Sequence, residues 1–244
     1  MEGRLPFFKN DKRKVHLLSA QMCHYKEYIS ANDKKCNLHT KDITYLFNTL
    51  LNVTKQLLPD FDLLPRGPVA EAFLRLGIQT MYQATAHITH LPYGRNADKN
   101  RPVTVLADRK GTCSTKHALL YLLAAEHDIQ ELQLTLGIFK MNGQNTPPVL
   151  KTLTSAGLDY IPEAHVYLKY RETILDYTHP GASSADFCKV LFLEKALLPQ
   201  DIGAEKIRLH RSFLEEWLSC HPDIPYSISE LWKIREQCIQ DLAG

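Results

Sequence analysis

Three residues of this chain, Cys113, His165 and Asp176, have the types that acyl transfer through a thiol requires. The nucleophile in such chemistry is a thiolate, which needs a base that takes the thiol proton and later gives it to a leaving amine. Histidine can act as that base, and a carboxylate on its second ring nitrogen fixes the tautomer and stabilises the imidazolium. The three residues are far apart in the sequence, so this chemistry depends on the elements that carry them.

Cys113 is predicted to lie in the first turn of a helix. A polar, glycine-led turn at 111–112 precedes it, and the run 118–125 after it is almost all apolar, which predicts a helix buried on most sides. Free backbone N–H groups and the positive dipole end at a helix N-terminus favour a thiolate. The Cys113 N–H would also help to hold an oxyanion. The alternative is an inert, buried cysteine.

His165 and Asp176 fall on the two strands of a predicted β-hairpin, 165–170 and 173–178, joined by the turn 171–172. In this register the facing pairs are Tyr170 with Thr173, Leu168 with Leu175, and Val166 with Tyr177. The opposite face carries His165 and Asp176 as diagonal neighbours, within reach of a side-chain hydrogen bond. Arg-Glu is not a favoured turn pair, and a shift of one position would separate the two residues by face.

The first part of the chain, residues 1–66, is predicted to be a helical subdomain without candidate chemistry. Apolar spacing predicts a helix over 15–30 and a second one after Thr40 that must stop near Pro59. The punctuated stretch 64–68 marks the boundary.

The middle part, residues 67–200, is predicted to be the core that carries the candidate chemistry. We expect a helix from Pro68 to about Thr89 and a half-buried strand over 132–139. Residues 142–161 are expected to be a long connection, either a lid or disordered. A further strand is predicted at 190–193.

The last part, residues 201–244, is predicted to be a pair of helices packed on the core. One covers 204–219, and the other opens at Ser227, which has capping-box spacing to Glu230.

Composition excludes several classes of function. The formal net charge is only +2, and the basic segment 9–14 is short and terminal, which argues against a nucleic-acid partner. No apolar run approaches the roughly 20 residues of a membrane span, and no signal-peptide core is present at the N-terminus. The six cysteines are scattered and lack zinc-finger spacing, which indicates reduced thiols and a cytoplasmic protein.

The sequence resembles the transglutaminase-like superfamily, part of the papain-like thiol fold, over roughly residues 79–180. The resemblance lies in Gly-Thr-Cys-Ser-Thr-Lys-His-Ala-Leu-Leu at 111–120, Glu-Ala-His-Val-Tyr-Leu at 163–168 and Ile-Leu-Asp-Tyr-Thr at 174–178. It implies an α+β fold in which a thiol-bearing helix packs on an antiparallel sheet, with helical additions at both ends.

The resemblance also implies an activity. The substrate would be an amide bond in a protein, peptide or peptide conjugate, attacked by Cys113 to give a thioester. His165 would act as general base and acid, Asp176 would orient it, and no metal or organic cofactor would be needed. Hydrolysis is slightly favoured over amine transfer, because nothing in the sequence marks a second amine pocket.

Several alternatives stay open. His117, at i+4 from Cys113, is a rival base, and His179 is a weaker one. Tyr93 and Gln79 are candidates for a second oxyanion donor. His87 and His90, at i and i+3, form a possible metal pair with His117 or Cys113, although two dipole-favoured helix-end imidazoles explain them more simply. The chain could also be a non-catalytic binding or scaffold module that keeps the transglutaminase-like fold.

Overall fold

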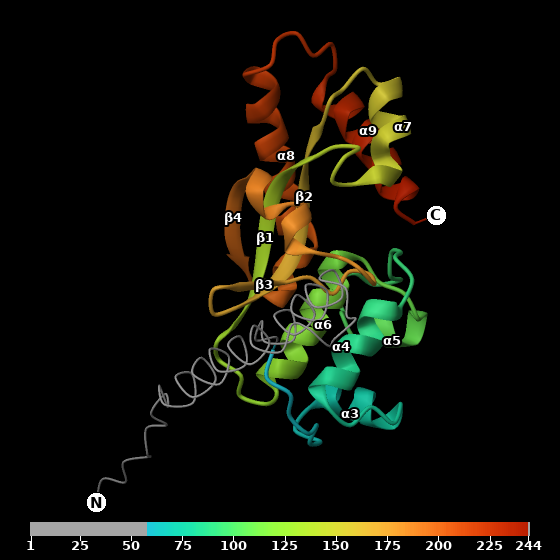
Figure 1. Ribbon diagram of the computed structural model, residues 1–244, viewed down its shortest axis with the longest axis vertical. Helices are drawn as coiled ribbons and strands as arrows, with labels where there is room; N and C mark the ends of the chain where they lie inside the picture. The colour runs from blue at the N-terminus through green and yellow to red at the C-terminus, as the bar shows by residue number, and fades with distance from the viewer. Residues whose placement is uncertain (1–57, 244) are drawn as a thin grey trace, which may run out of the picture. The chain divides into compact units, whose positions relative to one another are not determined.

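A four-stranded antiparallel sheet lies at the centre of the fold, with the strands in the order β3-β2-β1-β4 (Figure 1). The computed structural model describes residues 58–243, which belong to one compact unit of the chain, Gln56–Gly244. The helices predicted over 15–30 and after Thr40 lie outside these residues. The strands are β1 (Leu132–Met141), β2 (Ile161–Tyr170), β3 (Thr173–Leu175) and β4 (Leu191–Leu197). This combination of helices with an antiparallel sheet confirms the predicted α+β class.

The helices form two groups, which pack on opposite faces of the sheet. The first group is α3 (Pro68–Arg75), α4 (Met81–His90), α5 (Thr104–Asp108) and α6 (Cys113–Ala125). The second group is α7 (Leu150–Ser155), α8 (Ala204–Ser219) and α9 (Ile228–Asp241). Even-numbered residues of β1 and β2 pack in one core with α3, α4 and α6, whereas odd-numbered ones pack in a second core with α7, α8 and α9. This division follows from the alternation of side chains along a strand.

β1 is almost entirely buried, because it pairs with β2 on one side and β4 on the other and helices cover both faces of the sheet. The predicted half-buried strand over 132–139 is therefore wrong in its burial: Gln133 is the only exposed residue of β1. Even Thr135 is buried, because helices cover both faces of the sheet. The alternation of apolar and polar residues along the strand predicted helices on one face of the sheet only.

The β2–β3 hairpin has the predicted register over the three pairs from Tyr170–Thr173 to Leu168–Leu175. β3 ends at Leu175, so the expected pair of Val166 with Tyr177 does not form. Arg171 lies in the left-handed region, with φ 54°, and its guanidinium Nε donates to Glu131 Oε1 (3.1 Å). This contact with Glu131, the residue before β1, stabilises a turn whose Arg-Glu pair is otherwise unfavourable.

Two predicted segments differ from the structure. The single helix expected over 68–89 is two helices, because Gly77 adopts φ 77° after α3 and Thr80 caps the N-terminus of α4. The long connection expected over 142–161 is ordered and contains a 3₁₀ turn, η1 (Pro147–Val149), followed by α7. α7 forms because it packs on α9, a contact between distant parts of the chain.

The strand and the helices predicted after residue 189 are present in the structure. The strand expected at 190–193 is β4, which is longer than predicted, and the helix over 204–219 is α8. Ser227 and Glu230 form the expected capping box at the start of α9. Three 3₁₀ turns complete the described chain: η2 (Ser184–Asp186), η3 (Cys188–Val190) and η4 (Pro199–Ile202).

Candidate active site

The fold brings Cys113, His165 and Asp176 together. Cys113 is the first residue of α6, His165 is in the middle of β2, and Asp176 follows directly after β3. His165 Nε2 lies 2.8 Å from Asp176 Oδ2, which leaves Nδ1 as the ring nitrogen for the Cys113 thiol. The His165 side chain and the Val166 backbone N–H both favour the charged form of the thiol and lower its pKa. The site is largely closed, because Cys113 is 5% exposed and the His165 side chain 14%.

Local sequence fixes the first turn of α6. Thr112 is the N-cap, and it forms a capping box with Thr115. Thr115 Oγ1 also donates to Asn96 Oδ1 (2.6 Å), and Asn96 Nδ2 donates to the Lys110 carbonyl (2.8 Å). The polar loop before α6 thus holds the helix start in place. No hydrogen bond within the described residues occupies the Cys113 N–H, which leaves it available to an oxyanion.

The charges around the thiol favour an ion pair. Burial by itself raises the pKa of Cys113, but the charges of Lys206 and His165 outweigh it and lower this pKa to about 6. Burial by itself lowers the pKa of His165, but Asp176 and the thiolate outweigh it and raise this pKa to about 10. At neutral pH the pair is therefore thiolate and imidazolium, which is the reactive state of a thiol nucleophile.

Asp176 is fixed in its charged form by the segment that follows it. Its Oδ1 accepts hydrogen bonds from the backbone N–H of Thr178 (2.9 Å) and from Thr178 Oγ1 (2.5 Å), while Oδ2 faces His165. Burial opposes ionisation, but the His165 charge and these hydrogen bonds hold the pKa of Asp176 well below its usual range. Because β3 ends one residue earlier, Asp176 sits in a turn rather than on the sheet face that was predicted.

His117 is not free to act as the base. Its Nδ1 donates to the Cys113 carbonyl (2.8 Å), and its Nε2 accepts from the Tyr177 backbone N–H (2.7 Å), so both ring nitrogens are occupied. Burial lowers the pKa of His117 to about 4, which matches this neutral tautomer. His117 therefore links the residue that carries the thiol to the turn that carries Asp176.

Lys116 makes a second link beside it. The side chain is fully buried, and its Nζ donates to the carbonyls of Leu91 (2.5 Å) and Thr178 (2.6 Å). Burial lowers the pKa of Lys116 to about 8. This lysine joins the segment after α4 to the Asp176 turn, a place in the core that a lysine rarely occupies without partners.

Aromatic rings enclose His165 on the sheet face. Phe187, at the end of η2, has its ring centre 5.0 Å from that of His165, and Tyr167 and Phe139 lie at 5.9 and 6.2 Å. No sequence pattern pointed to Phe187, because it lies in an irregular segment. Asn96 lies in the polar segment before α6, where only its hydrogen bonds to Thr115 and Lys110 show its role.

The remaining candidates lie in different settings. Tyr93 forms an isolated β-bridge with Gly111, which lies two residues before Cys113. Burial and the nearby thiolate raise the pKa of the Tyr93 phenol well above its usual range. Gln79 is exposed at the start of α4, where its backbone N–H bonds to the side chain of Gln83 (2.7 Å). His179 is exposed beyond the hairpin and contacts the Pro180 carbonyl (3.0 Å).

The proposed metal pair finds no support within residues 58–243, where no group of three or more His, Cys, Asp or Glu side chains could hold a metal ion. His90 Nδ1 donates to the Ala86 carbonyl (2.8 Å), a capping contact at the end of α4. The His87 pKa is lowered by burial and by Arg109.

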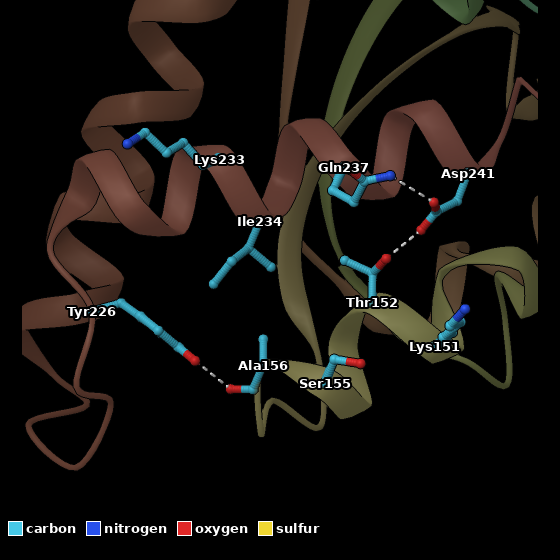
Figure 2. A pocket seen from close by; sticks show the side chains of 9 residues that line it. All are labelled: Lys151, Thr152, Ser155, Ala156, Tyr226, Lys233, Ile234, Gln237 and Asp241. Atoms are coloured by element: carbon cyan, nitrogen blue, oxygen red, sulfur yellow. Dashed lines mark hydrogen bonds between the residues drawn. The ribbon is translucent and has the colours of Figure 1, made fainter.

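A groove of about 590 Å³ between α7 and α9 lies apart from these residues (Figure 2). Its polar groups largely bond to one another: Thr152 Oγ1 and Gln237 Nε2 both donate to Asp241, and the Tyr226 hydroxyl donates to the Ala156 carbonyl. None of its lining residues belongs to the Cys113 site.

Comparisons of the chain with protein-family models, with curated proteins and with solved structures found no match. No helix in the described part of the chain is long and apolar enough to cross a membrane. The four cysteines in that part, Cys113, Cys188, Cys220 and Cys238, are free thiols. What the site can do chemically follows from its geometry: a buried thiolate beside an imidazolium that a carboxylate orients can attack a carbonyl and protonate the group that leaves.

Proposed function

We propose that this chain is a thiol enzyme with a transglutaminase-like core that acts on amide bonds through a Cys113 thioester. The observation that carries the proposal is the order of contacts from Cys113 to His165 and on to Asp176, with His165 Nε2 2.8 Å from Asp176 Oδ2. The lowered pKa of Cys113 supports the same assignment, because an inert core cysteine would have a raised one.

The first half of the reaction forms the thioester. The Cys113 thiolate attacks the amide carbonyl carbon, and the negative charge moves to the carbonyl oxygen, where the free Cys113 N–H can donate to it. The imidazolium of His165 then gives its proton to the amide nitrogen, and the C–N bond breaks to release an amine. This leaves an acyl group on Cys113 and a neutral His165.

The second half resolves the thioester. Neutral His165 takes a proton from water as the oxygen attacks the acyl carbon, the C–S bond breaks, and the thiolate–imidazolium pair returns. An amine in place of water would give a new amide instead. We favour hydrolysis, because nothing in the sequence marks a second pocket for an amine. The substrate would be a protein, peptide or peptide conjugate.

The test is the pH dependence of Cys113 alkylation by iodoacetamide, measured by peptide mass spectrometry in the native chain and in His165→Ala. Exposed Cys220 is an internal reference for an unassisted thiol in the same sample. We expect Cys113 to react with an apparent pKa well below the free-thiol value of about 8.5, and the substitution to raise it.

An ordinary or inert Cys113 in both proteins would contradict the enzyme proposal and favour a non-catalytic binding module. A reactive Cys113 that depends on His165 would justify screening amide substrates with and without added amines.

A further inference from the structure

A lysine from outside the triad reaches the first turn of α6. Lys206, in the first turn of α8, donates from Nζ to Ser114 Oγ (2.9 Å). Ser114 follows Cys113, and its Oγ lies 3.9 Å from Cys113 Sγ. Both Ser114 and Cys113 are buried, whereas Lys206 is partly exposed. The hydroxyl thus lies between an ammonium group and the thiol.

We propose that Lys206 is a positioning residue of the Cys113 site, which acts through the Ser114 hydroxyl to hold the Cys113 side chain as a thiolate. This inference rests on the proposed function, because it assigns a source for the reactivity of the same thiol. A hydroxyl that accepts from an ammonium group is polarised, and its own hydrogen is free to point at sulfur. The positive charge also acts directly on a buried anion through a medium of low dielectric constant.

The other charged and titratable groups around the thiol come from different elements. His165 on β2 is its partner, and Asp176 after β3 balances the charge of His165. Lys116 on α6 is bound to two backbone carbonyls, and Tyr93 is a neutral phenol beside the thiol. The positive charges of Lys206 and His165 both favour the charged form of Cys113.

α8 is held in a way that keeps Lys206 in place. His210, one turn further along the helix, is buried and donates from Nε2 to the Pro162 carbonyl of β2 (2.8 Å). Leu214 and Trp217 anchor the rest of α8 in the second core. The lysine therefore projects from a helix that is fixed to the strand of the catalytic base, and not from a mobile loop.

Stabilisation of the thiolate by Lys206 affects both halves of the proposed reaction. The thiolate is the nucleophile in the first half and the leaving group in the second, and Lys206 stabilises the same anion in each. Removal of the ammonium should therefore slow acylation by leaving less thiolate, and slow thioester breakdown by making the thiol a poorer leaving group.

The experiment compares Cys113 alkylation against pH in the native chain and in Lys206→Met, Lys206→Arg and Ser114→Ala. Lys195→Met is the matched control, because Lys195 pairs with Glu205 on the surface (3.6 Å) and makes no bond to Ser114. We expect Lys206→Met to raise the apparent pKa of Cys113 by about one unit. Ser114→Ala should shift it in the same direction, Lys206→Arg should keep most of the native value, and Lys195→Met should leave it unchanged.

Each result decides between distinct conclusions. A Lys206→Met profile that superimposes on the native one, while His165→Ala shifts it, would overturn the role of Lys206 and leave the proposed function standing. An inert Cys113 in the native chain would overturn both. An equal shift in Lys195→Met would also overturn the specific role, because any lost surface charge would then suffice. If circular dichroism shows that Lys206→Met does not fold, the apparent pKa of Cys113 in Ser114→Ala and in Lys206→Arg is compared with the native value instead.

Discussion

His117 and His165 lie with their ring centres 6.3 Å apart, and their surroundings give them opposite protonation states. His165 faces a carboxylate and a thiolate, which raise its pKa, whereas His117 is fixed between a backbone carbonyl and a backbone N–H, and burial lowers its pKa. The His117 Nε2 is 3.5 Å from Asp176 Oδ1, yet the Tyr177 N–H is closer and takes the lone pair. Contacts of this kind, not the residue type, decide which histidine can transfer a proton.

The pH window of the site follows from the same contacts. The pKa of Cys113 is lowered to about 6 and that of His165 is raised to about 10, so the ion pair forms as pH rises through the first value and is lost through the second. Asp176→Asn should narrow this window from both sides. The amide lacks the charge that stabilises the imidazolium, and its N–H₂ group would donate to His165 and impose the wrong tautomer.

The measurement is the rate of Cys113 alkylation between pH 5 and pH 10 in the Asp176→Asn protein. We expect a roughly tenfold or greater loss of rate at pH 7, with an apparent thiol pKa moved toward the free value of about 8.5. Thr178→Val is a useful control, since it removes one hydrogen bond to Asp176 and keeps the charge. A native profile in Asp176→Asn would show that the carboxylate does not orient the base.

At the scale of the elements, β1 needs a glycine at position 137, opposite His165. Gly137 of β1 pairs with His165 of β2, and a Cβ at this position would lie 2.7 Å from Leu191 Cδ2 and 2.8 Å from Tyr167 Cε1. Both are closer than packed side chains can approach. Glycine here lets Tyr167 lie across the sheet beside His165.

Gly137→Ala should therefore destabilise the fold by about 1–3 kcal/mol and reduce alkylation of Cys113 at pH 7. Gly94→Ala is the control, because its Cβ would meet only the flexible side chain of Lys110 (3.1 Å). The free energy of unfolding in urea measures the first effect. Equal stability of the two variants would mean that Tyr167 and Leu191 move aside without cost.

Sequence patterns predicted the elements whose signals are local. The helix that begins at Cys113, the capping box at Ser227 and the pairing of Leu168 with Leu175 were all signalled in short stretches of sequence, and the structure contains them. The contact of His165 with Asp176 followed from that register, even though β3 ends before Asp176.

What sequence patterns missed depends on distant contacts. α7 forms where a loop was expected, because α9 covers it, and β1 is buried on both faces by helices from both ends of the described chain. The bond from Lys206 to Ser114 joins residues 92 positions apart, and no spacing rule reaches that far. The two carbonyl partners of buried Lys116 lie 25 and 62 positions away, which is also beyond any local spacing rule.

At the scale of the whole described chain, an ionic network that is buried at Glu163 and Arg235 connects the C-terminal helix to the site. Glu163, two residues before His165 on β2, accepts two hydrogen bonds from Arg235 of α9. Arg235 also donates to Glu236 (2.8 Å), which pairs with Arg95 in the segment before α6. The network thus joins β2, α9 and the segment that leads to Cys113. Burial raises the pKa of Glu163, but the Arg235 charge outweighs it and lowers this pKa to about 2.

We expect Glu163→Gln and Arg235→Met each to destabilise the fold by about 3–5 kcal/mol, because each leaves an unpaired buried group. The double variant should cost much less than the sum. The folded-state pKa of Glu163 is depressed, so its stabilisation is complete above its ordinary pKa of about 4.5 and is lost as pH falls toward 2. The native chain should therefore lose more stability than Glu163→Gln between pH 6 and pH 3, as measured by urea unfolding. Two results would show that the pair does not couple α9 to β2. One is a double variant whose loss of unfolding free energy equals the sum of the two single losses. The other is an equal loss of stability with falling pH in the native chain and in Glu163→Gln.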